Sequence, residues 1–151
     1  MNKQEIYEYL SQQHIWYEVT EHKAVYNMED LSDVEIPYPQ ADAKNLFVRD
    51  NKKQNYYLIT FRKANGTRPL SFASEEDLTE KMGLQAGSVT PLGVLNDETC
   101  SVKVFVDAYF LENDALIGVH PNENTATIWM NTEDLLRIIR AHGNEVHCVS
   151  M

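Results

Sequence analysis

The sequence predicts one α+β domain over residues 1–151, in which helices flank a mixed and mostly antiparallel sheet. Three observations lead to this prediction. Short segments rich in β-branched and aromatic residues recur along the chain, with turn residues between them. Segments with helical spacing and capping residues stand at intervals among these strands. The chain has 151 residues, 43 % of them hydrophobic, which is enough for one core, and no repeat or linker divides it.

The first half of the chain predicts two helices and three strands. They are a helix over 3–13, a strand over 16–20, a helix over 28–34, and a hairpin with strands at 46–48 and 55–61. The first helix follows from Ile6, Tyr9 and Leu10, which recur with helical spacing. Pro37 and Pro39 end the second helix, because proline cannot continue it.

The second half predicts two helices and five strands. The helices cover 75–82 and 133–141, and the strands cover 92–95, 102–106, 117–120, 125–130 and 146–149. Ser74 is a suitable N-cap for the earlier helix, and Gly83 ends it. The later helix begins at Asn131 or Thr132 and ends at Gly143.

Composition and charge exclude several classes of function. No stretch approaches the length of a membrane span, and no signal peptide opens the chain. Cys100 and Cys148 are too few and too far apart for a zinc site or a disulfide framework, so reduced thiols in a cytoplasmic protein are expected. No pair of histidines has metal-ligand spacing, and we expect neither a metal nor a cofactor. The net charge of −10 argues against a general binder of nucleic acid, DNA included.

One segment departs from this acidic character. Residues 49–68 contain six cationic side chains and one carboxylate, so they carry +5 and leave −15 for the rest of the chain. The cations are Arg49, Lys52, Lys53, Arg62, Lys63 and Arg68. A basic segment on an acidic body can meet a phosphate backbone locally, and a solvated hairpin arm is the alternative interpretation.

Two stretches are candidates for chemistry, although no nucleophile motif such as Gly-x-Ser-x-Gly is present. Lys44 stands beside Asn45 at the entrance of the central strand. Its ammonium either snorkels to water or points into a pocket. The loop at 87–91 starts with Gly87 and Ser88, whose backbone N–H groups can stabilise an oxyanion. The alternative for this loop is an ordinary tight connection into a strand.

Two of the five histidines are better placed than the others for a site. His22 and His120 each lie at a junction between a strand and a loop. A histidine in such a place is also often just hydrogen-bonded to the backbone. Both interpretations stay open from the residues alone.

An ordered set of motifs favours the functional interpretation of Lys44, the loop at 87–91 and the histidines. The set reads Lys-Asn-Leu-Phe-Val-Arg-Asp at 44–50, Tyr-Tyr-Leu at 56–58, Leu-Ser-Phe-Ala-Ser-Glu at 70–75, Gly-Ser-Val-Thr-Pro at 87–91, Asn-Asp at 96–97 and His-Pro-Asn-Glu-Asn-Thr at 120–125. It closely resembles the YbaK/ProX superfamily of prolyl-tRNA editing deacylases, with the ProX branch nearest. The resemblance covers almost the whole chain, and its specificity lies in the order of the motifs rather than in any one of them.

The resemblance implies a mixed sheet with flanking helices and hydrolysis of the ester that joins an amino acid to tRNA. Its essential lysine falls on Lys44, and its loop glycine on Gly87, with Ser88 beside it. The implied substrate-binding residues are His22, Asn27, Asn45, Thr90 and His120, and the basic residues of 49–68 become tRNA contacts. Mischarged tRNA(Pro), most specifically Ala-tRNA(Pro), is the implied substrate, with prolyl-tRNA synthetase as a further partner.

Two departures from the family pattern leave alternatives open. Asn27 stands where relatives usually carry a threonine, which puts the choice of amino acid in doubt and keeps Cys-tRNA(Pro) as an alternative substrate. Between the Tyr-Tyr-Leu strand and residue 70, relatives usually carry a short helix of roughly a dozen residues that this chain lacks. A non-catalytic module that binds tRNA or a synthetase is therefore the second alternative.

Overall fold

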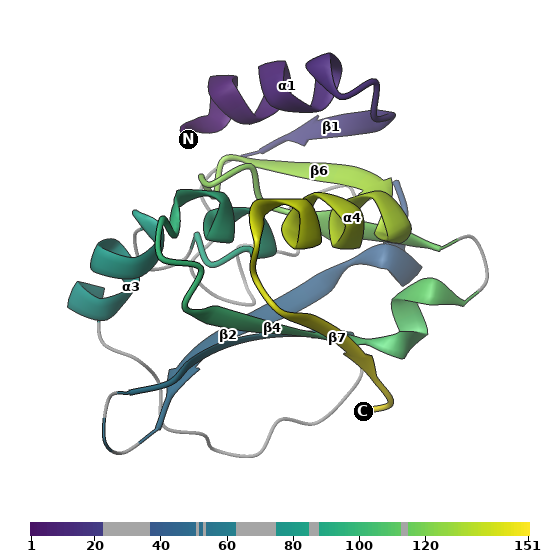
Figure 1. Cartoon of the computed structure of the whole chain (residues 1–151). Coiled ribbons are helices and arrows are strands. Elements are labelled where there is room, and N and C mark those ends of the chain that lie inside the picture. Colours follow the sequence, from purple (N-terminus) through teal and green to yellow (C-terminus); the bar gives the residue numbers. More distant parts are fainter. Residues whose placement is uncertain (23–36, 51, 53, 63–74, 85–87, 113–114) are drawn as a thin grey trace.

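The structure is a computed structural model of the chain, and it describes residues 1–22, 37–50, 52, 54–62, 75–84, 88–112 and 115–151 (Figure 1). The helix expected at 28–34 and the N-cap expected at Ser74 lie outside the described residues. Among the described residues, no helix is long and apolar enough to cross a membrane.

Within the described residues, seven strands form two sheets. In the three-stranded sheet, β6 (Ala126–Asn131) lies between β1 (Tyr17–Glu21) and β5 (Leu116–Val119), and both pairings are antiparallel. The four-stranded sheet has the order β2 (Ala43–Arg49), β3 (Tyr56–Arg62), β4 (Val102–Asp107) and β7 (Val146–Val149). Here β2 pairs antiparallel with β3, whereas β3–β4 and β4–β7 are parallel. The expected fold class is confirmed, with two sheets in place of one.

An isolated β-bridge between described residues joins the two sheets. Asp42, directly before β2, pairs in parallel with Gly118 of β5. Gly118 also faces Trp129 across the sheet, and a Cβ at position 118 would lie 2.3 Å from the Trp129 ring. Only glycine fits here, because any side chain would overlap the buried indole.

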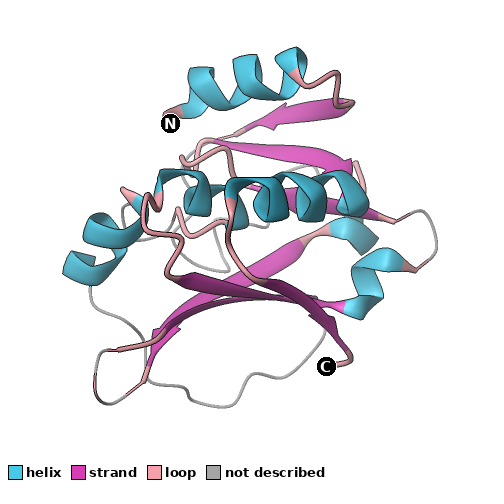
Figure 2. Ribbon diagram, viewed as in Figure 1, coloured by secondary structure: helices cyan, strands magenta, loops and turns pink. Residues whose placement is uncertain are grey.

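The described α-helices α1, α3 and α4 pack around the sheets, and Figure 2 draws them in cyan together with the 3-10 helices. Helix α1 (Lys3–Gln12) begins with a capping box between Asn2 and Glu5, and it buries Ile6 and Leu10. Helix α3 covers Glu75–Met82, and Gly83 follows it with a φ of +64°. Helix α4 (Thr132–His142) contacts β6 of one sheet and β7 of the other, so its apolar residues fill the space between the sheets.

One predicted strand is wrong. Residues 92–95 were expected to be extended, but they lie in η2, a 3-10 helix over Pro91–Asn96. The Thr90 hydroxyl caps this helix by accepting the Leu92 N–H, and Pro91 suits a first helical position. A short apolar run does not distinguish a strand from a buried helical turn, and here the cap decides. Two further 3-10 helices, η1 (Pro39–Ala41) and η3 (Ala108–Leu111), complete the described elements.

Candidate functional site

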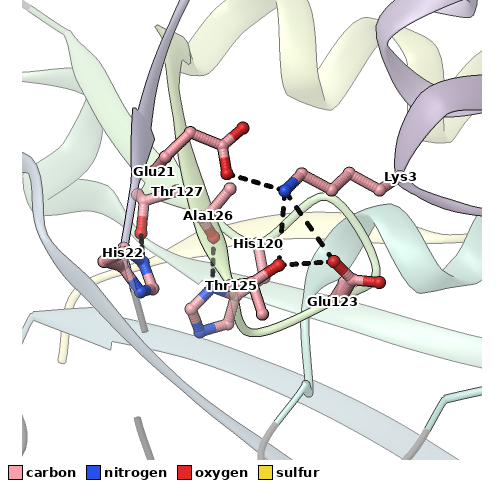
Figure 3. Close-up of polar contacts among 8 residues, drawn as sticks. All are labelled: Lys3, Glu21, His22, His120, Glu123, Thr125, Ala126 and Thr127. Carbon is pink, nitrogen blue, oxygen red and sulfur yellow. Dashed lines mark hydrogen bonds and ion pairs between the residues drawn. The ribbon is translucent and has the colours of Figure 1, made fainter. Parts of the chain in front are cut away.

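Two histidines from distant parts of the chain meet on one short segment of β6 (Figure 3). The backbone N–H of His22 donates to the Thr125 carbonyl at 2.9 Å, and His22 Nε2 lies 3.0 Å from the Thr127 hydroxyl. His120 Nδ1 lies 2.8 Å from the carbonyl of Ala126, between those two threonines. The two imidazoles are 6.1 Å apart between ring centroids and meet edge to face. Three consecutive residues thus hold both histidines predicted from the motifs.

The contact with Ala126 decides the tautomer of His120. A carbonyl oxygen only accepts hydrogen bonds, so Nδ1 must carry the proton. In the neutral ring the lone pair is therefore on Nε2. His120 is accordingly oriented so that Nε2 can accept a proton or align a donor, and Nδ1 serves to hold the ring.

Thr90 connects the loop before η2 to the His120 segment. Its hydroxyl donates to the His120 carbonyl at 2.7 Å and accepts the Leu92 N–H at 3.3 Å. The side chain is fully buried. These two hydrogen bonds join the loop before η2 to the His120 segment, and the prediction that Thr90 binds substrate stays a prediction.

Lys44 and Asn45 lie on opposite faces of β2, because successive side chains of a strand alternate. Asn45 faces Thr60 on β3, whose hydroxyl donates to the Asn45 carbonyl oxygen at 2.6 Å. Lys44 is exposed, and no hydrogen bond or ion pair joins it to another described residue. The two side chains therefore leave β2 on opposite faces, and the placement of the Lys44 cation in a pocket stays a prediction.

The bridge between the sheets places Lys44 near the histidines in the topology. Asp42 and Gly118 pair in parallel, so the two segments of the chain run in the same direction from this bridge. Lys44 lies two residues beyond Asp42, and His120 lies two residues beyond Gly118. Lys44 and His120 thus each follow, by two residues, one partner of the bridge that joins the two sheets.

Part of the predicted site lies outside the described residues, namely Asn27 and Gly87. Ser88 is described and is 7 % exposed, and its hydroxyl has no hydrogen-bond partner within the described part of the chain. The contribution of Gly87 and Ser88 to an oxyanion site stays a prediction.

The predicted tRNA contacts divide into three groups. Arg49 pairs with Asp77 at 3.4 Å, and Arg62 pairs with Asp107 at 3.2 Å. These two arginines are therefore committed in part to neighbouring carboxylates. Lys52 is exposed in the hairpin turn. The remaining predicted contacts, Lys53, Lys63 and Arg68, lie outside the described residues.

A second cluster places the Cys100 thiol beside His142, as in a nucleophile–base pair, but His142 does not activate the thiol. The Cys100 thiol lies 3.7 Å from His142 Nδ1. The Asn144 amide nitrogen donates to Asp97 and to the Val102 carbonyl, so the Asn144 oxygen must face His142 and accept from Nδ1 at 2.7 Å. Because Nδ1 carries that proton, it cannot take one from Cys100, whose sulfur instead donates to the His142 carbonyl.

Charged side chains lie beside residues 125–127, which hold the two histidines. The Lys3 ammonium lies 2.8 Å from Glu21 and 3.8 Å from Glu123, and it also donates to the Thr125 hydroxyl at 3.3 Å (Figure 3). Burial, then the negative charge of Glu21, raise the pKa of Tyr7 to about 12. No group of three potential metal ligands lies among the described residues.

The sequence missed Lys3, Thr125 and Thr127 as parts of this site. Lys3 belongs to α1 and meets Thr125 across 122 positions of sequence. Thr125 lies in the turn before β6, and Thr127 lies within β6. Thr125 ends the motif at 120–125, but no motif marks Lys3 or Thr127, and the contacts of all three residues depend on how β1 and β6 pair.

A family model and several relatives of known sequence match the chain. Residues 22–138 match the family model described as aminoacyl-tRNA editing domain. A relative from Acetoanaerobium sticklandii, named prolyl-tRNA editing protein ProX, is 36 % identical, and the match spans 99 % of this chain and 97 % of that protein. A Mus musculus protein named prolyl-tRNA synthetase associated domain-containing protein 1 is 34 % identical, over 85 % of this chain and 83 % of that protein.

Solved structures share the fold. One, described as a candidate trans-editing enzyme for prolyl-tRNA synthetase, superposes with a TM-score of 0.66. The match covers 99 % of this chain and 96 % of that chain, at 17 % sequence identity. At this identity the likeness establishes the fold alone.

Proposed function

Because the chain belongs to the aminoacyl-tRNA editing domain family, we propose that it hydrolyses the ester of mischarged tRNA(Pro), with Ala-tRNA(Pro) as its substrate. The observation that carries the proposal is the pair of histidines held by residues 125–127, at the crossing of the two sheets from which Lys44 emerges. The chemistry needed is modest, since an aminoacyl ester is already activated and positioning with an oxyanion site suffices.

Each residue has a part in this proposal. Lys44 binds the terminal phosphate or adenosine and adds positive potential beside the ester carbonyl. The backbone N–H groups of Gly87 and Ser88 stabilise the tetrahedral oxyanion. His120, whose Nδ1 is held by Ala126, presents Nε2 to the amino acid or to the attacking water.

The remaining predicted residues act around this centre. His22 and Asn27 shape the wall that selects the amino acid. Asn45 positions β2 through its bond with Thr60, and Thr90 positions His120. The ribose 2′-hydroxyl of the tRNA takes part in the attack, so no protein nucleophile is required.

Docking of the tRNA is proposed on the basic segment 49–68, with Lys52 as its exposed described cation. The acidic remainder keeps the overall affinity weak. We place the protein in the cytoplasm, where charged tRNA is made, and propose prolyl-tRNA synthetase as a partner that supplies the mischarged product.

The test is a deacylation assay on tRNA(Pro) charged with alanine, cysteine or proline. We expect rapid release of alanine, slower release of cysteine and no release of proline, because a small pocket excludes the larger ring. Preferential release of cysteine would overturn the alanine assignment. Tight binding of tRNA(Pro) without release of any amino acid would establish a binding module instead.

A further inference from the structure

We propose that Lys3 is a positioning residue of the editing site, and that its ammonium ties the segment before His22 to the segment that carries His120. This inference rests on the proposed function for its effect on catalysis. Its structural basis is independent of that function, because it stands on contacts among residues from three separate parts of the chain.

The Lys3 ammonium contacts three side chains that frame the histidines (Figure 3). Glu21, one residue before His22, lies 2.8 Å away, and Glu123 lies 3.8 Å away in the loop after His120. The third contact is the Thr125 hydroxyl at 3.3 Å, which also donates to Glu123. One cation therefore holds both sides of the site.

Thr125 links the Lys3 contacts to both histidines, because residues 125–127 provide the hydrogen-bond partners of His22 and His120. Its carbonyl accepts the backbone N–H of His22. The next residue, Ala126, accepts the Nδ1 proton of His120, and Thr127 contacts His22 Nε2. A shift of Thr125 would therefore move the hydrogen-bond partners of His22 and His120 together.

The loop that follows His120 has a further tie to the start of the chain. Asn122, with a φ of +63°, donates through its side-chain amide to the Met1 carbonyl at 2.8 Å. Residues 1–3 thus hold this loop at two points, through the Met1 backbone and through the Lys3 side chain. The left-handed conformation of Asn122 indicates that the loop is bent to reach this position.

The energetics favour a positioning role over a stabilising one. The Glu21 and Glu123 side chains are 63 % and 52 % exposed, and exposed ion pairs contribute little to fold stability. Without Lys3, however, two carboxylates would stand uncompensated beside a site that must accept a polyanion. Loss of Lys3 should then weaken tRNA binding as well as displace the histidines.

The catalytic test compares Lys3→Met, Lys3→Arg and a matched control, Lys103→Met. Lys103 is a partly buried lysine of β4, and its ammonium lies 5.8 Å from the Tyr57 ring centroid in the other sheet. We expect Lys3→Met to lower kcat for Ala-tRNA(Pro) about tenfold and to raise KM, because a small misplacement of catalytic groups is costly. Lys3→Arg should recover most of kcat, and Lys103→Met should change neither constant.

The structural test uses the imidazole NMR signals of the full chain. In Lys3→Met, the signals of His22 and His120 should shift, whereas the signal of His147, on β7 of the other sheet, should stay in place. Unshifted His22 and His120 signals would overturn the proposal, as would an unchanged kcat in an active enzyme. If the wild type releases no amino acid at all, the proposed function fails, and the NMR comparison still decides the role of Lys3.

Discussion

Two clusters that contain histidine differ in how their polar groups are buried and held. In one, His142 and Asn144 belong to a buried network around Asp97, whose carboxylate accepts hydrogen bonds from Thr99, Ser101, Val102 and Asn144. Asp97 is 2 % exposed and Asn144 is 3 % exposed. In the other, His22 and His120 are held by β6 and by ion pairs whose carboxylates are more than half exposed.

This difference indicates which cluster should affect stability and which should affect turnover. A buried polar network is costly to leave unsatisfied, so the Asp97 cluster contributes to stability. The His22–His120 cluster is framed by ion pairs whose carboxylates are exposed, and such pairs contribute little to stability, so its residues should matter for turnover. Substitutions should therefore separate into those that change the melting temperature and those that change kcat.

The largest effect is expected at Lys44. Lys44→Ala should lower deacylation of Ala-tRNA(Pro) by about 100-fold or more, because the positive potential beside the ester is lost. Its stability should stay within about 0.5 kcal/mol of the wild type, since the side chain is exposed. Lys81→Ala, which removes a cation 4.9 Å from the Tyr56 ring centroid, is the control. Normal turnover by folded Lys44→Ala would break the assignment of this cation to the site.

Asn144→Ala should give the opposite result. It leaves the Val102 carbonyl and the His142 Nδ1 proton without partners and removes one donor from Asp97. We expect a loss of about 3 kcal/mol in the free energy of unfolding, with kcat of the folded enzyme nearly unchanged. Urea titration measures the loss, and Gln54→Ala on the exposed hairpin is the control. A specific fall in kcat would show that this cluster acts in catalysis.

Thr90→Val should fall between these two cases. It keeps the shape of the side chain but removes the hydroxyl that serves both the His120 carbonyl and the Leu92 N–H. We expect a loss of about 1–2 kcal/mol in stability together with a several-fold lower kcat. Thr79→Val is a matched control, because the Thr79 hydroxyl donates to the Leu84 carbonyl away from the histidines. Equal kcat in both variants would contradict the positioning role of Thr90.

The smallest effect is expected at Asp50, a partly exposed carboxylate that can be compared with the buried carboxylate of Asp97. Hydrogen bonds from the Asn55 side chain and the Gln54 backbone hold the pKa of Asp50 below its usual value of 3.8. The stability that this carboxylate contributes is therefore present above the unfolded pKa and is lost as the pH falls through the lower folded pKa. Asp50→Asn should shift the urea midpoint slightly at pH 7, and the difference from wild type should narrow in acid. A difference that widens in acid would contradict this assignment.

Local patterns predicted most elements of the fold. The helices expected over 3–13 and 133–141 are α1 and α4, and the edge strand at 146–149 is β7. These segments have strong periodicity or clear capping residues. The division into two sheets was not predictable, because it depends on which distant strands pair.

The site was predictable only in part, for a similar reason. His120 and Lys44 belong to the ordered set of motifs, His22 follows from the family resemblance, and the structure brings the two histidines together. Lys3 and Thr127 acquire their roles through contacts between segments more than 100 positions apart. Thr90 was identified in the correct loop, but its burial, and therefore its role, could be seen only in three dimensions.

The pairing of β1 with β6 also has a consequence for synthesis on the ribosome. Strand β1 covers Tyr17–Glu21, and its partner covers Ala126–Asn131. At roughly 5–20 residues per second, a nascent chain waits on the order of 5–20 s between making one strand and the other. Throughout this interval His22 has neither Thr125 nor Thr127 to hold it. The ability to edit should therefore arrive late and abruptly during translation, and a chain that stops before β6 should never acquire it.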